Sequence, residues 1–192
     1  MDILFNLAVY ALKFYGFFVL LRFFMQYFRV DFYNPVSQSI VKLTNPPLIP
    51  LRKIIPGFRN MDIASLVLAL IISSIVLSLA FNLWQAISLS NLFIFLILFI
   101  GQLIYSILNL FFFLLIIRII MSFVMMGQGF HQNPIAEMIF QITEPIMRPF
   151  QKLIPPVGVL DFSPILLFAA IWVSQMVLNK VAQSIAPGLF FI

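Results

Sequence analysis

The sequence contains one segment twice. Residues 34–70 align with residues 133–169 without a gap, at an offset of 99, and eleven of the 37 aligned positions are identical. Apolar segments match one another by composition alone, but the identical pairs here include Asn, Thr, Pro, Lys and Asp. They are Asn34/Asn133, Pro35/Pro134, Thr44/Thr143, Pro46/Pro145, Pro50/Pro149, Lys53/Lys152, Pro56/Pro155 and Asp62/Asp161, with three aliphatic pairs. The repeat predicts a molecule built from two similar halves.

Composition places these halves in a membrane. Of the 192 residues, 63% are hydrophobic and only 9% are charged, whereas soluble domains carry about 25% charged residues. A bilayer core requires about 20 apolar residues per helix, and four segments qualify, roughly 4–27, 63–87, 92–120 and 163–186. We expect an all-α membrane protein of two parallel repeats, residues 1–91 and 92–192, each a span, an amphipathic helix and a second span. An even number of spans per repeat gives both halves the same orientation.

The charge distribution predicts the topology. Nine of the eleven Lys and Arg residues lie in the two long connections, between Arg22 and Arg59 and between Arg118 and Lys152. The positive-inside rule places such connections in the cytoplasm, so both termini and the short turn between the second and third spans are expected outside. The net charge of +5 is expected to meet anionic lipid headgroups rather than nucleic acid, because the basic residues flank spans.

Each long connection is expected to begin with a short amphipathic helix. Asn34-Pro35 and Asn133-Pro134 suit a helix start, with Asn as the N-cap and Pro at the first helical position. The expected apolar face comprises Val36, Ile40 and Leu43, matched by Ile135, Ile139 and Ile142, while Ser37, Gln38, Lys42, Glu137 and Gln141 face away. We expect each helix to stop near Thr44 or Thr143, because prolines follow. It is either a platform facing lipid or a partner, or a re-entry segment packed on the bundle.

A basic stretch punctuated by prolines follows each helix, at residues 50–56 and 149–155. We expect its backbone to be extended and stiff. Lys53, Lys152, Arg52 and Lys42 are candidates for lipid or partner contact, because apolar neighbours dip into the membrane while the cations meet headgroup phosphates. A dedicated ligand site is the alternative. Asp62 and Asp161 precede the next spans and suit N-caps, with an ion-pair or ion-binding role as the alternative.

Polar residues also lie inside the spans, where side chains usually face protein or water. An offset of 96 aligns Lys13 with Asn109 and Arg22 with Arg118. The arginines either snorkel to the cytoplasmic surface or pair with Asp62 or Asp161 across the bundle. Lys13 either snorkels to the outer surface or lies near Asn109, which could then form a hydrogen bond close to it.

The sequence shows no catalytic constellation. It has no cysteine and a single histidine, His131, which excludes thiolate sites and a histidine-based metal site. Nucleotide-binding and hydrolase motifs are missing from the sequence as well. We therefore expect no catalytic, cofactor or metal site, and no enzymatic activity.

The order of the repeated residues resembles the YggT (YlmG) family in its two-repeat bacterial form. Each copy has a span ending in Arg, an Asn-Pro helix start, Thr-x-Pro, Pro-x-x-Lys-x-Ile-Pro and a closing Asp. One departure is Gln151, which stands where the first copy has Arg52. The resemblance implies a multi-pass protein of the bacterial inner membrane, linked to osmotic and cation stress tolerance but without a settled biochemical activity.

Two functions fit these features. The first is a non-enzymatic organiser or assembly factor of envelope components, whose platforms contact anionic lipid and an unidentified membrane-protein partner. The second is a small ion or osmolyte transporter or channel component, favoured by the repeat, the polar positions in the spans and the stress link. The cores of the spans lack acidic residues that could bind or relay cations, so we favour the organiser. Homo-oligomerisation is left open.

Overall fold

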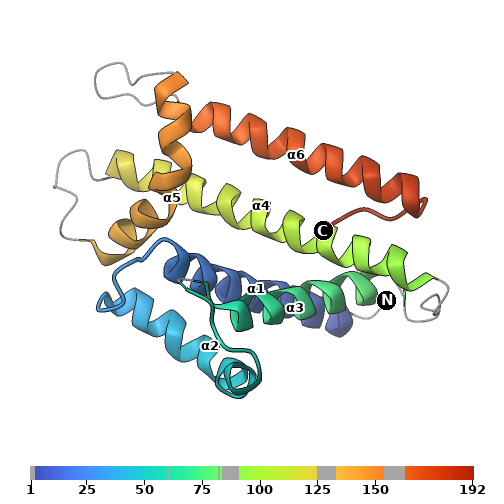
Figure 1. Ribbon diagram of the computed structural model, residues 1–192. Helices are drawn as coiled ribbons and strands as arrows, with labels where there is room; N and C mark the ends of the chain where they lie inside the picture. Colours follow the sequence, from blue (N-terminus) through green and yellow to red (C-terminus); the bar gives the residue numbers. More distant parts are fainter. Residues whose placement is uncertain (1–2, 60, 82, 84–90, 125–132, 154–162) are drawn as a thin grey trace.

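The computed structural model describes residues 3–59, 61–81, 83, 91–124, 133–153 and 163–192. These residues form six helices (Figure 1): α1 (Ile3–Tyr27), α2 (Pro35–Ile54), α3 (Ile63–Phe81), α4 (Leu92–Val124), α5 (Pro134–Leu153) and α6 (Ser163–Ile185). Four of them, α1, α3, α4 and α6, are long and apolar enough to cross a membrane. The expected all-α, four-span architecture is confirmed.

The four spans form one bundle, with α1 against α3, α4 against α6, and α3 against α4 across the two halves. The connector helices α2 and α5 lie at the same end of this bundle, and both chain termini lie toward the other end (Figure 1). The main buried cluster joins the spans to the connectors, and Leu20, Leu110, Leu114 and Ile139 are among its almost fully buried members. The connectors are therefore part of the packed molecule.

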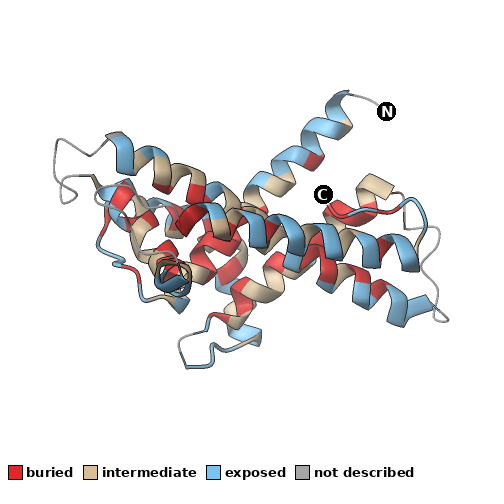
Figure 2. Ribbon diagram, turned by 90° about the horizontal axis from the view of Figure 1, so that it is seen from above, coloured by how far each residue is buried: buried red, intermediate tan, exposed pale blue. Residues whose placement is uncertain are grey.

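Small residues let the spans approach closely. A Cβ atom added to Gly16 would lie 3.0 Å from Cγ2 of Ile72, so glycine in α1 allows close packing on α3. Because apolar burial drives little association between helices in lipid, such packing matters more in a membrane than in water. The outer sides of the spans are exposed and apolar, and the first turns of α1 stand clear of the bundle (Figure 2).

Both connector helices continue through their prolines, and the expected stops at Thr44 and Thr143 are wrong. The expected extended stretches are wrong as well, because α2 includes Pro46, Pro47 and Pro50 and α5 includes Pro145 and Pro149. An interior proline removes a backbone hydrogen bond and bends a helix without always ending it, and Figure 1 shows both connectors bent. Burial holds the segments beyond the bends in place, since Leu48 and Met147 are 0% exposed.

Candidate functional site

The connector helices start as the sequence predicts. The side-chain oxygen of Asn34 accepts a hydrogen bond from the Val36 amide at 2.9 Å, and that of Asn133 accepts one from the Ile135 amide at 3.0 Å. The side-chain amide of Asn34 also donates to the Pro134 carbonyl at 2.7 Å. The N-caps therefore do two things: they begin the helices, and one of them joins the starts of α2 and α5.

A buried arginine from each half holds its connector. Arg22 of α1 is 5% exposed, and its Nη1 donates to Oγ1 of Thr44 at 2.7 Å and to Oδ1 of Asn45 at 2.8 Å. The same nitrogen donates to the Val41 carbonyl at 2.9 Å. Thr44 in turn donates to the Ile40 carbonyl at 2.7 Å. We call this set the first arginine clasp, and it fixes α2 against the C-terminal end of α1.

The second arginine clasp repeats this geometry with one change. Arg118 of α4 is 8% exposed and donates from Nη1 to Oγ1 of Thr143 at 2.8 Å, and Thr143 donates to the Ile139 carbonyl at 2.7 Å. Its Nη2 pairs with Glu144 at 2.8 Å, where the first clasp has the neutral amide of Asn45. The second clasp thus includes an ion pair, whereas the three hydrogen bonds of Arg22 in the first go to neutral acceptors.

Neither alternative for Arg22 is found: it does not pair with Asp62, and it is buried rather than snorkelled to the surface, as is Arg118. Asp62 instead pairs with Arg52 through two guanidinium nitrogens and accepts a bond from the Ser65 hydroxyl. Burial acts to raise the pKa of Asp62, but hydrogen bonds from Arg52 and Ser65 outweigh it and hold the pKa below its ordinary value. The carboxylate precedes α3, so it caps that span and ties the end of α2 to it. Asp161 lies outside the described residues.

Arg52 also has a contact within the protein that the sequence did not predict. Its guanidinium is held by the buried carboxylate of Asp62 and stabilises the connector, while its side chain remains 35% exposed, so its lipid or partner contact stays a prediction. The other three basic candidates, Lys42, Lys53 and Lys152, are exposed.

Each connector has one face packed on the bundle and one face exposed. Ser37, Ile40, Thr44 and Leu48 of α2 are buried, and the matching buried set of α5 is Ala136, Met138, Ile139, Ile142, Thr143 and Met147. Ser37 was expected to face outward and is buried, so that assignment is wrong; Leu43 and Ile135, expected on the apolar face with Ile40 and Ile139, lie on the exposed side instead of against the bundle. The reason is tertiary: the arginine clasps set the rotation of each helix, so the threonine side faces the bundle.

The exposed connector face combines cations with large apolar side chains. On α2 it includes Lys42, Leu43, Ile49, Lys53 and Ile54, and on α5 it includes Ile135, Arg148, Lys152 and Leu153. Ile54 is 79% exposed and Leu153 is 72% exposed, each next to a lysine. We call these residues the outer connector face. Exposed apolar side chains beside lysines are typical of helices that lie in a membrane interface.

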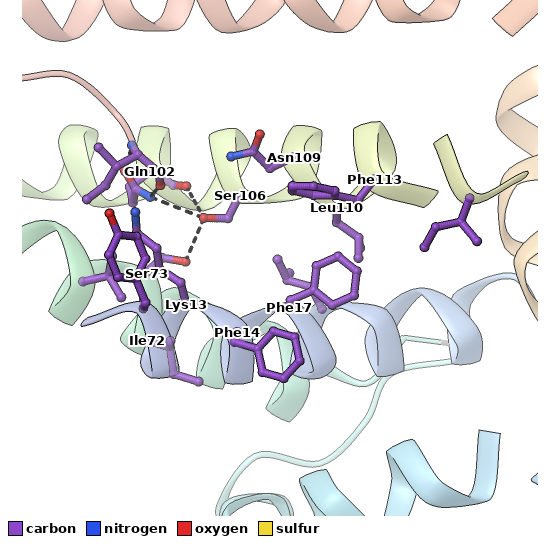
Figure 3. A pocket seen from close by; sticks show the side chains of 16 residues that line it. Lys13, Phe14, Phe17, Ile72, Ser73, Gln102, Ser106, Asn109, Leu110 and Phe113 are labelled. Carbon is purple, nitrogen blue, oxygen red and sulfur yellow. Dashed lines mark hydrogen bonds between the residues drawn. The ribbon is translucent and has the colours of Figure 1, made fainter. Parts of the chain in front are cut away.

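An open pocket of about 570 Å³ lies between α1, α3 and α4, and Tyr10, Phe14 and Phe113 of its wall are more than half exposed. Lys13 and Asn109, the two candidates from the span interiors, both line it (Figure 3). Asn109 accepts a hydrogen bond from Gln175 of α6 at 3.0 Å, and the Lys13 ammonium lies 5.4 Å from the centre of the Tyr10 ring. The structure thus brings both candidates to one pocket, although Asn109 accepts its hydrogen bond from α6 and not from Lys13.

Three other polar residues line this pocket, Ser73, Gln102 and Ser106; the repeat offset of 96 already aligned Gln102 with Asn6 as a polar position within the spans, but it was not a site candidate. Gln102 is 1% exposed and exchanges two hydrogen bonds with the backbone of Ile192, at 2.6 and 3.2 Å. Ser106 lies between its neighbours, 3.4 Å from Nε2 of Gln102 and 3.5 Å from Oγ of Ser73. The available signal was the spacing of Gln102, Ser106 and Asn109, which lie four and three positions apart and so share one face of α4. Within the described ranges, no group of three or more His, Cys, Asp or Glu residues is placed to hold a metal ion.

The fold and the clasped connectors define a class: a multi-pass helical membrane protein with two amphipathic helices fixed at one end of its bundle. The chain belongs to the CCB3/YggT family, whose sequence model matches residues 1–84 and 97–182. It is 43% identical to an uncharacterised protein of Pseudomonas aeruginosa, covering 91% of this chain and 90% of that protein.

Further relatives match over similar lengths. The uncharacterised protein YggT of Escherichia coli K12 is 36% identical, over 94% of this chain and 93% of its own length. An uncharacterised protein of Haemophilus influenzae is 33% identical, over 84% and 83%. No solved structure matches the chain significantly.

Proposed function

We propose that the protein is a non-enzymatic organiser of the bacterial inner membrane that assembles or positions envelope components through its two connectors. In this proposal the connectors face the cytoplasm, and both termini and the short turn between α3 and α4 lie outside. The protein would thereby contribute to osmotic and cation stress tolerance. The observation that carries the proposal is the pair of arginine clasps, which fix two helices whose outer faces are basic and apolar.

The clasps support a docking role because they limit the entropy lost on binding. Short helices are marginal in isolation, and a flexible helix would have to be ordered when a partner bound. Here Arg22 and Arg118 hold the connectors through side-chain contacts to Thr44 and Thr143. A partner or a lipid surface would therefore meet two helices that are already positioned.

Lipid contact is the first interaction that we assign to the outer connector face. A basic residue near an anionic membrane surface contributes about 1 kcal/mol, so Lys53 and Lys152 together would add a modest attraction. The adjoining side chains Ile54 and Leu153 would enter the interface while the lysines remain at the headgroups. A membrane-protein partner would then dock on the part of the face left free by lipid.

The alternative function, a small ion or osmolyte transporter, would use the cavity between the spans. Lys13 and Asn109 at its wall favour this alternative. Against it, the described wall is mainly aromatic and aliphatic and includes no Asp or Glu side chain, which makes it a poor path for cations. Four continuous spans also differ from the broken helices that form many transporter sites. The organiser is therefore the better supported function.

Complementation under osmotic stress separates the two functions. A strain lacking the chromosomal copy would be supplied with the wild type, with Lys53→Glu plus Lys152→Glu, or with Lys13→Ala plus Asn109→Leu. The organiser requires growth to be lost in the connector variant and kept in the cavity variant, with all proteins inserted to equal levels. Lys180→Glu, an exposed charge reversal outside both sites, is the matched control.

Potassium and sodium flux into proteoliposomes under an osmotic gradient provides the second readout. The organiser predicts no flux above that of empty liposomes. Growth lost only in the cavity variant, together with flux from the wild type, would replace the organiser with the transporter. Wild-type growth of both variants would contradict both assignments.

A further inference from the structure

One contact between the two halves of the molecule has an equivalent that the chain does not make. The second span of the first half, α3, packs on the first span of the second half, α4. Since α4 is the repeat of α1 and α6 is the repeat of α3, the equivalent contact would join α6 to α1. In the described part of the chain, α6 packs on α4 and α5 but makes no comparable contact with α1, and α4 lies between them (Figure 1). One surface of α1 and one of α6 are therefore unpartnered.

The repeat determines which positions of the spans correspond. The two clasp arginines make equivalent contacts, so an offset of 96 relates α1 to α4. The aligned repeat has an offset of 99, which continues along α3 and α6 because both helices are unbroken. The hydroxyls of Ser73 and Ser106 lie 3.5 Å apart where α3 meets α4 (Figure 3). Their equivalents are Trp172 of α6 and Tyr10 of α1.

Positions that are buried in α4 are exposed in α1. Leu110 is 0% exposed, whereas its equivalent Phe14 is 66% exposed. Leu103 is also buried, and its equivalent Leu7 is exposed. Leu7, Tyr10 and Phe14 lie three and four positions apart, so they form one apolar face of the helix. We call these three residues the open face of α1.

The second spans of the two halves differ in the same way. Leu77 and Ser73 of α3 are buried, whereas their equivalents Met176 and Trp172 of α6 are 40% and 61% exposed. The two exposed residues lie four positions apart and share one face of α6. A span normally exposes apolar side chains to lipid, so exposure alone would not indicate a partner. The indication here is that the exposed positions of one half are packed in the other half.

A second copy of the chain carries both of the missing surfaces. Its α6 has the face that would pack on α1 of the first copy, and its α1 would receive α6 in return. If both copies have the same orientation in the membrane, the two helices run antiparallel, as consecutive spans such as α3 and α4 do. Two copies can close such a reciprocal contact about a twofold axis. Close packing of side chains is the main source of helix association in lipid.

We propose that two copies of the chain form a dimer in which α6 of each copy packs on α1 of the other. Trp172 and Met176 would lie against the open face of α1, repeating the contact between α3 and α4. Tyr10 and Phe14 also belong to the open wall of the pocket between α1, α3 and α4, so the second copy would cover this wall. The dimer surface lies on the spans, away from the outer connector face, and does not rest on the proposed function.

Disulfide cross-linking in native membranes tests the proposal, because the chain has no cysteine. Two single-cysteine chains with different affinity tags, Tyr10→Cys and Trp172→Cys, would be expressed together in one strain and oxidised. We expect a cross-linked dimer that carries both tags, because these positions are the equivalents of two side chains in contact. Ser73→Cys with Ser106→Cys in one chain is the positive control and should form a disulfide within the monomer, since the two hydroxyls lie 3.5 Å apart.

Ile104→Cys is the matched negative control for Tyr10→Cys. Ile104 is exposed, and it precedes the equivalent of Tyr10 by two positions, which places it on another side of α4. Expressed with Trp172→Cys, it should give no dimer that carries both tags.

Alanine substitutions locate the surface. Leu7→Ala with Phe14→Ala, introduced into the Tyr10→Cys chain, removes most of the packing surface and should lower the yield of the doubly tagged dimer. Ile97→Ala with Ile100→Ala is the matched control, because it truncates two exposed side chains of α4 and should leave the yield unchanged. An unchanged yield in the Leu7 and Phe14 variant would contradict the assigned surface.

Three further results would overturn the proposal. The first is no doubly tagged dimer under conditions in which the positive control forms its disulfide. The second is equal cross-linking of Ile104→Cys, which would indicate random collision. The third concerns one chain that carries both Tyr10→Cys and Trp172→Cys. A disulfide found only within its monomer would show that α6 closes on α1 of its own chain.

Discussion

The first arginine clasp makes a quantitative prediction about Thr44. Thr44 is fully buried, accepts a hydrogen bond from Arg22 at 2.7 Å and donates one to the Ile40 carbonyl. Thr44→Val keeps nearly the same volume and deletes only the hydroxyl, so the change isolates these two bonds. A hydrogen bond to a charged group is worth about 1.5 to 3 kcal/mol. Arg22 keeps its bonds to Val41 and Asn45, which limits the loss to about 1 to 3 kcal/mol.

Ser39 offers a matched control on the same helix. Its hydroxyl donates to the Pro35 carbonyl at 2.9 Å, four residues back, as Thr44 does to Ile40, but it lies on the exposed face. Ser39→Ala should therefore change the free energy of unfolding by no more than about 0.5 kcal/mol. Because the two variants delete comparable hydroxyl groups, their difference reports the arginine contact.

Reversible unfolding in mixed micelles with increasing sodium dodecyl sulfate, followed by circular dichroism, measures both variants. Thr143→Val tests the second arginine clasp in the same way and should lose a similar amount of stability. If Thr44→Val were no less stable than Ser39→Ala, the bond between Arg22 and Thr44 would contribute nothing. The arginine contact would then not be what sets the rotation of α2 against the bundle.

Other contacts make further predictions for the same unfolding assay. Because the pKa of Asp62 is lowered in the folded protein, the Asp62 carboxylate contributes to the free energy of unfolding. This contribution is complete above the ordinary carboxyl pKa and is lost as the pH falls through the lower folded-state pKa. Asp62→Asn should remove this pH dependence. Glu144→Gln should cost at most about 1 kcal/mol, because Glu144 is 37% exposed and water can replace the ion pair with Arg118; a larger loss would show that this pair is a major stabilising contact. Gly101→Ala would place a Cβ 2.5 Å from the Phe191 ring, so we expect faster hydrogen exchange in residues 188–192, and unchanged exchange would contradict the packing of that segment.

Local rules predicted the helix starts, and tertiary contacts explain why the helix ends were missed. The caps at Asn34 and Asn133 depend on one side chain and the next two residues, so they could be predicted without knowing the fold. The stops near Thr44 and Thr143 also followed a local rule, but burial of Leu48 and Met147 stabilises the helix beyond the prolines. Propensity is a weak guide where packing is extensive.

The partners of the buried arginines could not be predicted from spacing alone. Pairing Arg22 with Asp62 was reasonable because both residues lie near the same end of the spans. Asp62 pairs instead with Arg52, which precedes it by only ten residues in the chain. One signal pointed to the true partner: the chain has only two threonines, and they occupy equivalent positions of the repeat. Their role depends on how α1 and α4 meet the connectors, which is a property of the packed molecule.

The central claim is that the outer connector face lies at the membrane interface. The chain has no cysteine, so a spin label can be placed at Ile54→Cys or Leu153→Cys without removing other thiols. Collision accessibility would be measured by electron paramagnetic resonance in nanodiscs containing anionic lipid. We predict that both labels are relaxed more by oxygen, which concentrates in the bilayer, than by a water-soluble nickel complex. Stronger relaxation by the nickel complex at both positions would place the connectors in water and contradict the claim.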